Sequence, residues 1–450
     1  MSSKSKNNMM NMTEGNPLGL LIRFSIPMLI GNLFQQLYNL ADSVIVGKLV
    51  GSDALAAVGA TSSITFMFFA LCNGIGSAGG IVTSQSFGRG DEKGIKRCIT
   101  NTGYIMFVFP LIVGIIAFFI AGPILEFLKT PADIMHDSLM YLRVMCVGLM
   151  FVSVYNYISS ILRALGDSKT PLYFLVFSCF LNIILDVIFV YVLKTGVVGA
   201  AIATLVSQFT SGICCTIFAF SKNPYFKFAK EDLAADRDII LSVVKLGVPL
   251  SLQFSLIAIS CMALQRVVNS FGAVAIAAFT ATSRIEQLIH QPYSTLGSSL
   301  STYTGQNYGA GKRDRIIKGY HQGLIMMAVF SAVMLPIMQF FGANIMRLFV
   351  NEVPVIEMGA MALKITSWFY VFLGLIYVVR GVLNGLSDSF FALFNGIIEV
   401  FGRVFVPTPL TMIAAIGVWG IWGSVGIVWF ISGATAWFRY LYFMKKKITI

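Results

Sequence analysis

The chain has 450 residues and a formal net charge of +12, yet 57% of its residues are hydrophobic and only 12% are charged. Because soluble domains carry about 25% charged residues, this composition excludes a soluble protein and indicates an integral membrane protein. The long apolar segments do not alternate at every second residue, which also excludes a membrane β-barrel. We therefore expect an all-α polytopic membrane protein.

Twelve segments have the length and apolar character of transmembrane helices, which need about 20 residues to cross a bilayer. The first is interrupted by polar residues, and the eighth is rich in small residues. We predict spans near residues 18–41, 55–80, 98–121, 138–160, 171–193, 198–220, 240–263, 275–300, 319–342, 358–380, 391–412 and 419–442.

The chain also repeats itself. Residues 84–90 return as 305–311 and residues 165–168 return as 386–389, which is a constant offset of 221 positions. A match at one offset, across loops as well as apolar segments, predicts two copies of one module. Each copy holds six of the predicted spans.

Since six is an even number, both copies enter the membrane in the same direction. Parallel repeats of this kind are related by an axis along the membrane normal, so we predict two six-helix lobes with pseudo-two-fold symmetry. The expected parts are an N-terminal tail (1–17), an N-lobe (18–220), an interlobe linker (221–238), a C-lobe (239–443) and a basic C-terminal tail (444–450).

The distribution of lysine and arginine predicts the orientation. If both termini are cytoplasmic, 23 of the 32 basic residues lie in inner loops, tails and span entrances, and five lie in outer loops. This distribution follows the positive-inside rule, so the net charge is mainly a topology signal. We expect a multi-pass protein of the cytoplasmic (inner) membrane, monomeric, with both termini in the cytoplasm and no nucleic-acid partner.

Four acidic residues fall within or at the edge of apolar segments: Asp42, Asp186, Glu286 and Glu399. A charged residue at the bilayer centre costs about 2.5–3.5 kcal/mol on insertion scales, so each is a functional candidate. The offset of 221 places Ala263 opposite Asp42 and Pro407 opposite Asp186. Only the first copy carries those two acids.

Four polar residues of the first copy are expected at one depth. Asp42 lies near the outer end of the first span, Asn182 and Asp186 share one face of the fifth, and Thr204 lies within two turns of the outer end of the sixth. Two carboxylates with an amide and a hydroxyl can accept a proton or coordinate Na⁺ as a metal site. Alternatively, Asp42 faces water and Asp186 is satisfied by Asn182 and nearby amides.

The second copy has a different polar set. Arg284, Glu286 and His290 lie on the eighth span, and Glu399 and Arg403 lie four apart on the eleventh. These are candidates to line a substrate cavity, with Glu286 meeting a cationic substrate. Alternatively, Glu399 and Arg403 form a local ion pair, Arg403 or Arg284 neutralises Glu286, and His290 is a hydrogen-bonded bundle residue.

Several other activities are excluded by the sequence. Residues 306–313 resemble a phosphate-binding loop but lack its first Gly and final Ser or Thr. No constellation of catalytic or transition-metal ligands is visible, and the chain has three His. We therefore expect no enzymatic activity and no cofactor, with an ion gradient as the energy source.

Four short motifs resemble the multidrug and toxic compound extrusion family, in its prokaryotic branch related to damage-inducible transporters and within the wider flippase superfamily. They are Arg23–Met28 leading into Leu37–Asp42, Gln85–Gly90, Leu162–Asp167 and Leu181–Asp186. The resemblance covers nearly the whole chain. It implies a V-shaped pair of six-helix lobes that works as a cation-coupled drug antiporter.

By motif, the resemblance also assigns residues. It implies an H⁺ or Na⁺ site at Asp42, Asn182, Asp186 and Thr204, with Tyr141 in the same group. It further implies bending of the first span at Pro27. The other prokaryotic branch places acids on the seventh and tenth spans, but 249–261 and 368–380 contain none here, so a second-lobe cation site of that type is not expected.

These observations together predict a secondary active exporter of amphipathic, cationic organic compounds, exchanging them for H⁺ or Na⁺ by alternating access. The first alternative is a flippase for lipid-linked precursors from the same superfamily. The second is a membrane receptor or enzyme without transport, which would need an extramembrane segment longer than the loop 221–238.

Overall fold

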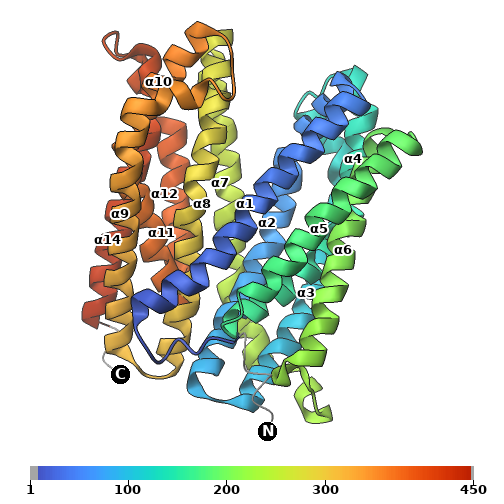
Figure 1. The fold of residues 1–450 in the computed structure, drawn as a ribbon, viewed down its shortest axis with the longest axis vertical. Helices are drawn as coiled ribbons and strands as arrows, with labels where there is room; N and C mark the ends of the chain where they lie inside the picture. The colour runs from blue at the N-terminus through green and yellow to red at the C-terminus, as the bar shows by residue number, and fades with distance from the viewer. Residues whose placement is uncertain (1–8, 447–450) are drawn as a thin grey trace. The chain divides into compact units, whose positions relative to one another are not determined.

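The structure of the chain is a computed structural model that describes residues 9–446. The outer parts of both predicted tails, 1–8 and 447–450, lie outside the described residues. Within the described range the chain is helical and contains no strand. Figure 1 shows that the helices run lengthwise beside one another within each unit.

The first half of the chain contains six long helices and three short elements. They are α1 (Pro17–Leu49), α2 (Ser52–Arg89), α3 (Glu92–Phe127), α4 (Ala132–Ala164), α5 (Lys169–Asp186), the π-helix η1 (Val187–Val192), α6 (Gly196–Lys222), and the 3₁₀ turns η2 (Pro224–Phe226) and η3 (Lys230–Leu233). The second half contains α7 (Arg237–Asn269), α8 (Ala273–Gly309), α9 (Arg313–Met346), α10 (Val353–Ser367), α11 (Tyr370–Gly385), α12 (Ser389–Phe405), α13 (Pro407–Met412), the 3₁₀ turn η4 (Gly417–Trp419) and α14 (Gly420–Lys446).

Each of the twelve predicted spans falls on one helix or on consecutive helical segments. Among the described residues, ten helices are long and apolar enough to cross a membrane, and the pair α10–α11 makes an eleventh. This pair is bent by 52°, whereas the sequence predicts one unbroken span over 358–380. Helix α8 has 37 residues, but it is not among the helices that are apolar enough to cross a membrane, because it carries charged and small residues.

The described chain forms two compact units. Unit 1 comprises Met1–Met12 and Arg23–Ser255, and unit 2 comprises Thr13–Ile22 and Leu256–Ile450. These boundaries fall inside α1 and α7, because the first part of α7 packs within unit 1: a Cβ on Gly247 would lie 2.6 Å from the Ile75 side chain. The lobe boundaries expected from the repeat stay a prediction.

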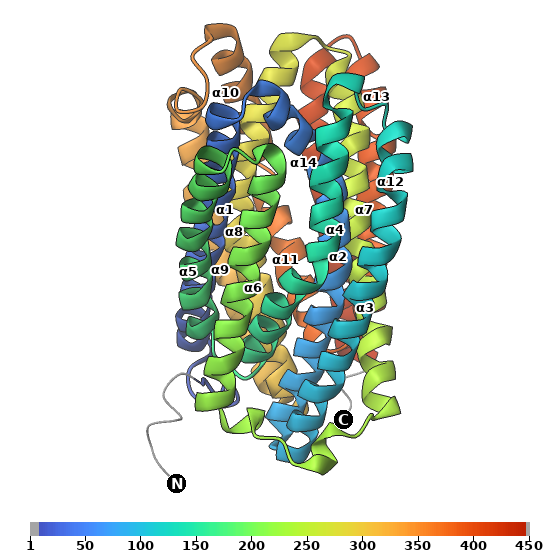
Figure 2. The same cartoon turned by 90° about the vertical axis from the view of Figure 1, so that its right-hand side faces the viewer.

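Helix α4 is central in unit 1 and packs against α2, α3 and α6. In Figure 2, α6 and α4 lie between α5 and α3. The close approach of α4 and α6 depends on Gly148, since a Cβ there would lie 1.9 Å from the Leu205 side chain. The buried cluster around this contact includes Val46 of α1 and Tyr141 of α4, so α1 also packs against α4 and α6 here.

The start of α5 is held by Asp167. Its carboxylate accepts hydrogen bonds from the backbone N–H of Lys169 at 3.1 Å and of Thr170 at 3.0 Å, and from the Thr170 hydroxyl at 2.6 Å. Burial raises the pKa of Asp167, while the hydrogen bonds from Thr170 oppose this shift. A side chain that occupies unpaired N–H groups at a helix start stabilises that start, which sets the position of Asn182 and Asp186 further along α5.

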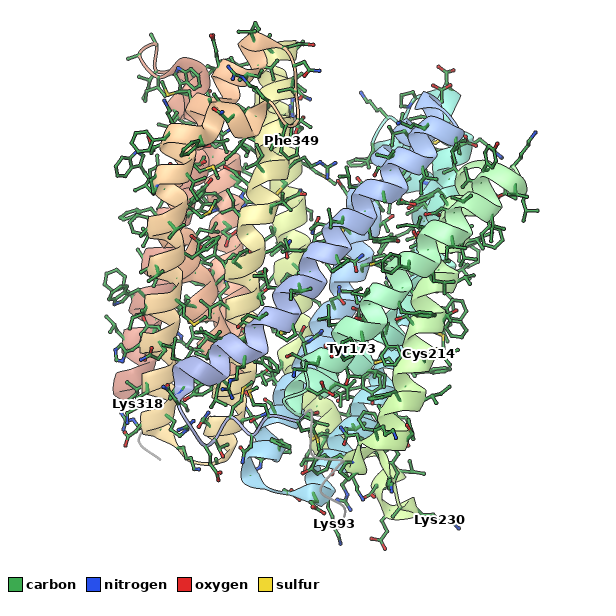
Figure 3. The ribbon with its side chains drawn as sticks, in the orientation of Figure 1. Lys93, Tyr173, Cys214, Lys230, Lys318 and Phe349 are labelled. Carbon is green, nitrogen blue, oxygen red and sulfur yellow. The ribbon has the colours of Figure 1, made fainter. Side chains whose placement is uncertain are left out.

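The predicted linker is an ordered part of unit 1. Thr100 donates to the Asp232 carbonyl at 2.7 Å and Tyr104 donates to the Leu233 carbonyl at 2.7 Å, and Lys96 forms an ion pair with Asp232 at 3.8 Å. Lys93 of α3 and Lys230 of η3 lie at the same end of unit 1 (Figure 3). These basic residues therefore share one side of the unit.

We predict that Gly148→Val destabilises the protein by about 1–3 kcal/mol, because overpacking separates α4 from α6. The measurement is the thermal unfolding midpoint of purified protein in detergent. Gly59→Val is the control, since a Cβ at Gly59 meets no atom within 4 Å. Equal midpoints for the two variants would contradict the assigned contact.

Candidate functional site

The polar residues predicted for the first copy lie in unit 1 on four helices. Asp42 lies on α1, Tyr141 on α4, Asn182 and Asp186 on α5, and Thr204 on α6. Asp186 and Asn182 are fully buried, whereas Asp42 and Thr204 are half-buried. The structure therefore brings together residues that are separated by up to 162 positions in the chain, counted from 42 to 204.

The two carboxyl groups are in direct contact. The side chain of Asp42 lies within hydrogen-bonding reach of the Asp186 side chain. In each of the two carboxyl groups, Oδ1 is buried without a hydrogen-bond partner. Within residues 9–446, no ion pair reaches either acid.

Asn182 connects this pair to α6. With its nitrogen towards Asp186, the Asn182 amide donates to Asp186 Oδ2 at 2.7 Å and accepts from the Thr204 backbone N–H at 3.1 Å. The opposite orientation would place the amide oxygen against a carboxylate oxygen, so the hydrogen-bond network decides the assignment. Asn182 therefore satisfies one oxygen of Asp186 and leaves the contact with Asp42 uncompensated.

Tyr38 also belongs to this site, although the sequence analysis did not select it. Its hydroxyl donates to Thr204 Oγ1 at 3.2 Å, and its ring is buried, with an exposed fraction of 7%. Tyr38 precedes Asp42 by four residues and so shares its face of α1. That spacing is the signal from which Tyr38 could have been selected.

Helix α5 changes its geometry directly after Asp186. The next six residues, Val187–Val192, form a π-helix. Such segments are rare and occur often at functional sites, because they shift the side-chain register within a helix. The change begins at the residue that carries the buried carboxyl group.

The arrangement lacks one positive charge. Two carboxylates in contact inside a low-dielectric bundle cannot both be ionised without a compensating cation. A single proton shared by the pair would satisfy the contacting oxygens, and Na⁺ would fit oxygen donors from Asp42, Asn182, Asp186 and Thr204. Among residues 9–446, no group of three or more His, Cys, Asp or Glu could hold a metal ion.

In unit 2, Glu399 is held by two arginines. It pairs with Arg403, four residues later on α12, at 3.7 Å, which agrees with the alternative interpretation of these two residues. Arg380 of α11, which the sequence analysis did not select, also forms an ion pair with Glu399. Arg380 additionally donates to Asn395 Oδ1 at 2.8 Å through Nε. Glu399 therefore belongs to a compensated buried network.

Glu286 is in a different environment. Its Oε1 is buried without a hydrogen-bond partner, as are the hydroxyls of Thr366 and Tyr370. Both hydroxyls lie near the Glu286 carboxyl group, and that of Thr366 is within hydrogen-bonding reach of it. Arg284 is exposed and lies two residues from Glu286, so the two side chains point to different faces of α8. Arg403 is close enough to Glu286 to act on its carboxyl group electrostatically, but the two do not form an ion pair within 4 Å.

His290 packs among aromatic rings. Its imidazole lies edge-on to Trp429, with ring centroids 5.5 Å apart, and to Tyr377, with centroids 6.2 Å apart. Pro27 lies inside α1, which continues through it from Pro17 to Leu49. The roles of His290 in substrate binding and of Pro27 in bending stay predictions.

Comparison with known proteins gives concordant matches along the chain. A sequence profile of the MatE family matches residues 27–188 and 249–408. The probable multidrug resistance protein YpnP of Bacillus subtilis is 31% identical, covering 97% of this chain and 98% of its own. The probable multidrug resistance protein YoeA of the same species is 26% identical, covering 88% of each chain.

A solved structure has the same fold. A MOP superfamily transporter from Pyrococcus furiosus superposes with a TM-score of 0.88 at 24% identity, covering 99% of this chain and 100% of its own.

We predict that Arg380→Met destabilises the protein by about 3 kcal/mol, because it leaves a buried carboxylate without its nearest cation. The double variant Arg380→Met, Glu399→Gln should recover part of the loss in the thermal unfolding midpoint. Arg97→Met is the control: it breaks an exposed pair, with Asp236 at 3.8 Å, and should change stability by less than about 1 kcal/mol. A double variant no more stable than Arg380→Met would contradict the assigned pairing.

Proposed function

The chain belongs to the MatE family of multidrug and toxic compound extrusion transporters, and on that premise we propose that it exports amphipathic organic cations in exchange for H⁺ or Na⁺. The relatives described above carry names of multidrug resistance proteins, which supports export of varied small organic molecules. The helices of membrane-spanning length and composition make it a multi-pass membrane protein. We further propose that it acts as a monomer in the cytoplasmic membrane, with both termini in the cytoplasm.

One observation carries the proposed coupling mechanism: Asp42 and Asp186 are in contact, and within the described residues no basic side chain forms an ion pair with either of them. When the site is empty and both groups are ionised, the carboxylates repel each other across α1 and α5. Uptake of one cation removes this repulsion and lets the two helices close. Since the ion stabilises one conformation over the other, its gradient can drive the change of access.

We favour H⁺ as the coupling ion. Carboxyl groups in direct contact can share one proton, whereas Na⁺ would have to separate them by coordinating an oxygen of each. If the protein is sodium-coupled instead, the ligands are Asp42, Asn182, Asp186 and Thr204, with Tyr38 and Tyr141 beside them.

We assign cation recognition on the substrate side to Glu286. Its Oε1 has no hydrogen-bond partner, so a positively charged substrate group would supply the missing interaction. Glu399 is engaged by Arg380 and Arg403 and serves to hold α11 against α12. Arg284 and His290 would border this region without charge complementarity to a cation.

We also propose that α1 bends at Pro27 during the cycle. Proline removes one backbone hydrogen bond from a helix interior and weakens it locally. Pro27 lies 15 positions before Asp42 on the same helix, so bending there would move Asp42 relative to α5. Ion binding at one end of α1 and bending at the other are then parts of one movement.

The alternative function is a flippase for lipid-linked precursors. Such a substrate carries phosphates and needs unpaired cationic side chains in the cavity. Both buried arginines of the unit 2 network face Glu399, which gives this alternative less support than export of organic cations.

We predict that Asp42→Asn and Asp186→Asn each abolish gradient-driven efflux of a fluorescent organic cation from proteoliposomes. Loss occurs because an amide neither binds a proton nor offers the charge that a cation needs. Imposed pH and Na⁺ gradients, applied separately, identify the coupling ion. Asp133→Asn is the control, since Asp133 is exposed in the first turn of α4. Unchanged efflux in both variants would contradict the proposed coupling site.

We predict a smaller effect for Tyr38→Phe. The variant loses the hydrogen bond to Thr204, a contribution of about 1 kcal/mol, so the half-saturating concentration of the coupling ion should rise about five-fold while the maximal rate is kept. Tyr173→Phe is the control, because Tyr173 lies on α5 with an exposed side chain (Figure 3). Equal ion dependence in both variants would exclude Tyr38 from the site.

A further inference from the structure

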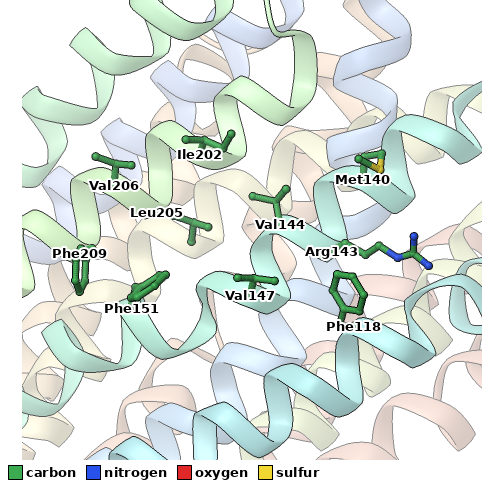
Figure 4. A pocket seen from close by; sticks show the side chains of 10 residues that line it. All are labelled: Phe118, Met140, Arg143, Val144, Val147, Phe151, Ile202, Leu205, Val206 and Phe209. Atoms are coloured by element: carbon green, nitrogen blue, oxygen red, sulfur yellow. The ribbon is translucent and has the colours of Figure 1, made fainter.

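Unit 1 contains a groove of about 490 Å³ between α4 and α6, closed at one end by α3. Figure 4 shows the side chains that line it. They belong to ten residues of α3, α4 and α6. Nine of these ten residues are apolar, and the tenth is an arginine.

The groove lies on the outer surface of the helix bundle. Val147 and Val206 line it with exposed fractions of 60% and 39%, within helices of membrane-spanning length and composition. Tyr141 and Met145 of α4 point instead into the buried cluster beside the cation site. The groove therefore opens towards the hydrocarbon of the membrane, on a face of α4 adjacent to the one that carries Tyr141.

Arg143 lacks a charge partner. Its Nε is buried without a hydrogen-bond partner, and within the described residues no carboxylate forms an ion pair with it. Its guanidinium lies 5.1 Å from the centre of the Phe118 ring. An arginine in a transmembrane segment is costly unless it is paired. Arg380 and Arg403 are both paired with Glu399, whereas Arg143 has no such partner within the described residues.

The arginine lies at one end of the groove. In Figure 4, Arg143, Met140 and Phe118 occupy one end, and Phe151 and Phe209 occupy the other. Phe151 follows Arg143 by eight positions, which corresponds to about 12 Å of helix. The guanidinium extends away from the two phenylalanines, towards the end of α4 at which the helix begins. A charged group thus lies at one end of a long apolar groove.

We propose that this groove binds one anionic phospholipid, with its phosphate against the Arg143 guanidinium and one acyl chain between α4 and α6. The planar guanidinium presents five N–H donors in a geometry that suits phosphate. The headgroup would supply the missing negative charge, and the chain would cover the exposed valines. In the predicted orientation, the lipid comes from the outer leaflet.

The bound lipid would also brace the helices of the cation site. Leu205 lines the groove and belongs to the buried cluster that contains Tyr141, and it follows Thr204 directly on α6. A chain seated between α4 and α6 therefore contacts residues adjacent to two members of the site. This inference does not depend on the proposed transport activity, because lipid binding is measured without a gradient.

The test is native mass spectrometry of the purified protein titrated with phosphatidylglycerol, which is anionic, or phosphatidylcholine, which is zwitterionic. The unaltered protein should bind the first phosphatidylglycerol about five-fold more tightly than phosphatidylcholine. Arg143→Met should remove this preference, and Arg143→Lys should keep part of it. Lys364→Met is the control: Lys364 stands 221 positions after Arg143 in the second copy, with an exposed side chain, and its loss should leave the preference unchanged.

A second variant tests the acyl channel without removing the charge. Val147→Trp fills the groove from its exposed side and should lower binding of the first lipid of either class at least about five-fold, because it occupies the space of the chain. Equal binding of the two lipids by the unaltered protein, or a preference kept in Arg143→Met, would overturn the proposal. So would unchanged binding in Val147→Trp, and this variant decides the matter if Arg143→Met fails to fold.

Discussion

Two carboxyl groups that touch inside a membrane bundle need a positive charge between them, and unit 1 is arranged around this requirement. Asp42 and Asp186 meet where α1, α4, α5 and α6 converge, and the described part of the chain supplies amide and hydroxyl groups there but no ion pair to either acid. The coupling ion that we propose would supply this charge from solution. The helices that carry these groups are held together by the close packing of α4 on α6 at Gly148, and α5 changes to a π-helix directly after Asp186.

The two units treat buried charge in opposite ways. In unit 2, Glu399 forms ion pairs with Arg380 and Arg403. Because its charge is compensated by the protein, Glu399 does not need to bind an ion. Unit 1 leaves an acidic pair uncompensated on its inner side and one arginine, Arg143, uncompensated on its lipid side. Because an uncompensated charge in a low-dielectric environment is costly, we propose a ligand for each: the coupling ion for the acidic pair and an anionic lipid for Arg143.

Much of this could be predicted from the sequence, because hydropathy identifies spans without knowledge of packing and because Asn182 and Asp186 share a helix face at a spacing of four. The pair Glu399–Arg403 has the same spacing and was predictable as an alternative. The partner Arg380 was not, since it is 19 positions from Glu399 on another helix and only packing brings them together. The bend between α10 and α11 and the π-helix after Asp186 also escape hydropathy, which reports the composition of a segment but not its backbone path.

The most direct measurement counts the cations released when substrate binds to the purified protein in detergent, with a pH indicator for protons and a sodium indicator in parallel. The account predicts that binding of an organic cation releases about one proton, or one Na⁺, per protein, and that replacing Asp42 or Asp186 by Asn abolishes the release while the protein stays folded. Substrate binding with no release of either ion, or release that is unchanged in both variants, would contradict the central claim that this carboxyl pair holds the coupling ion.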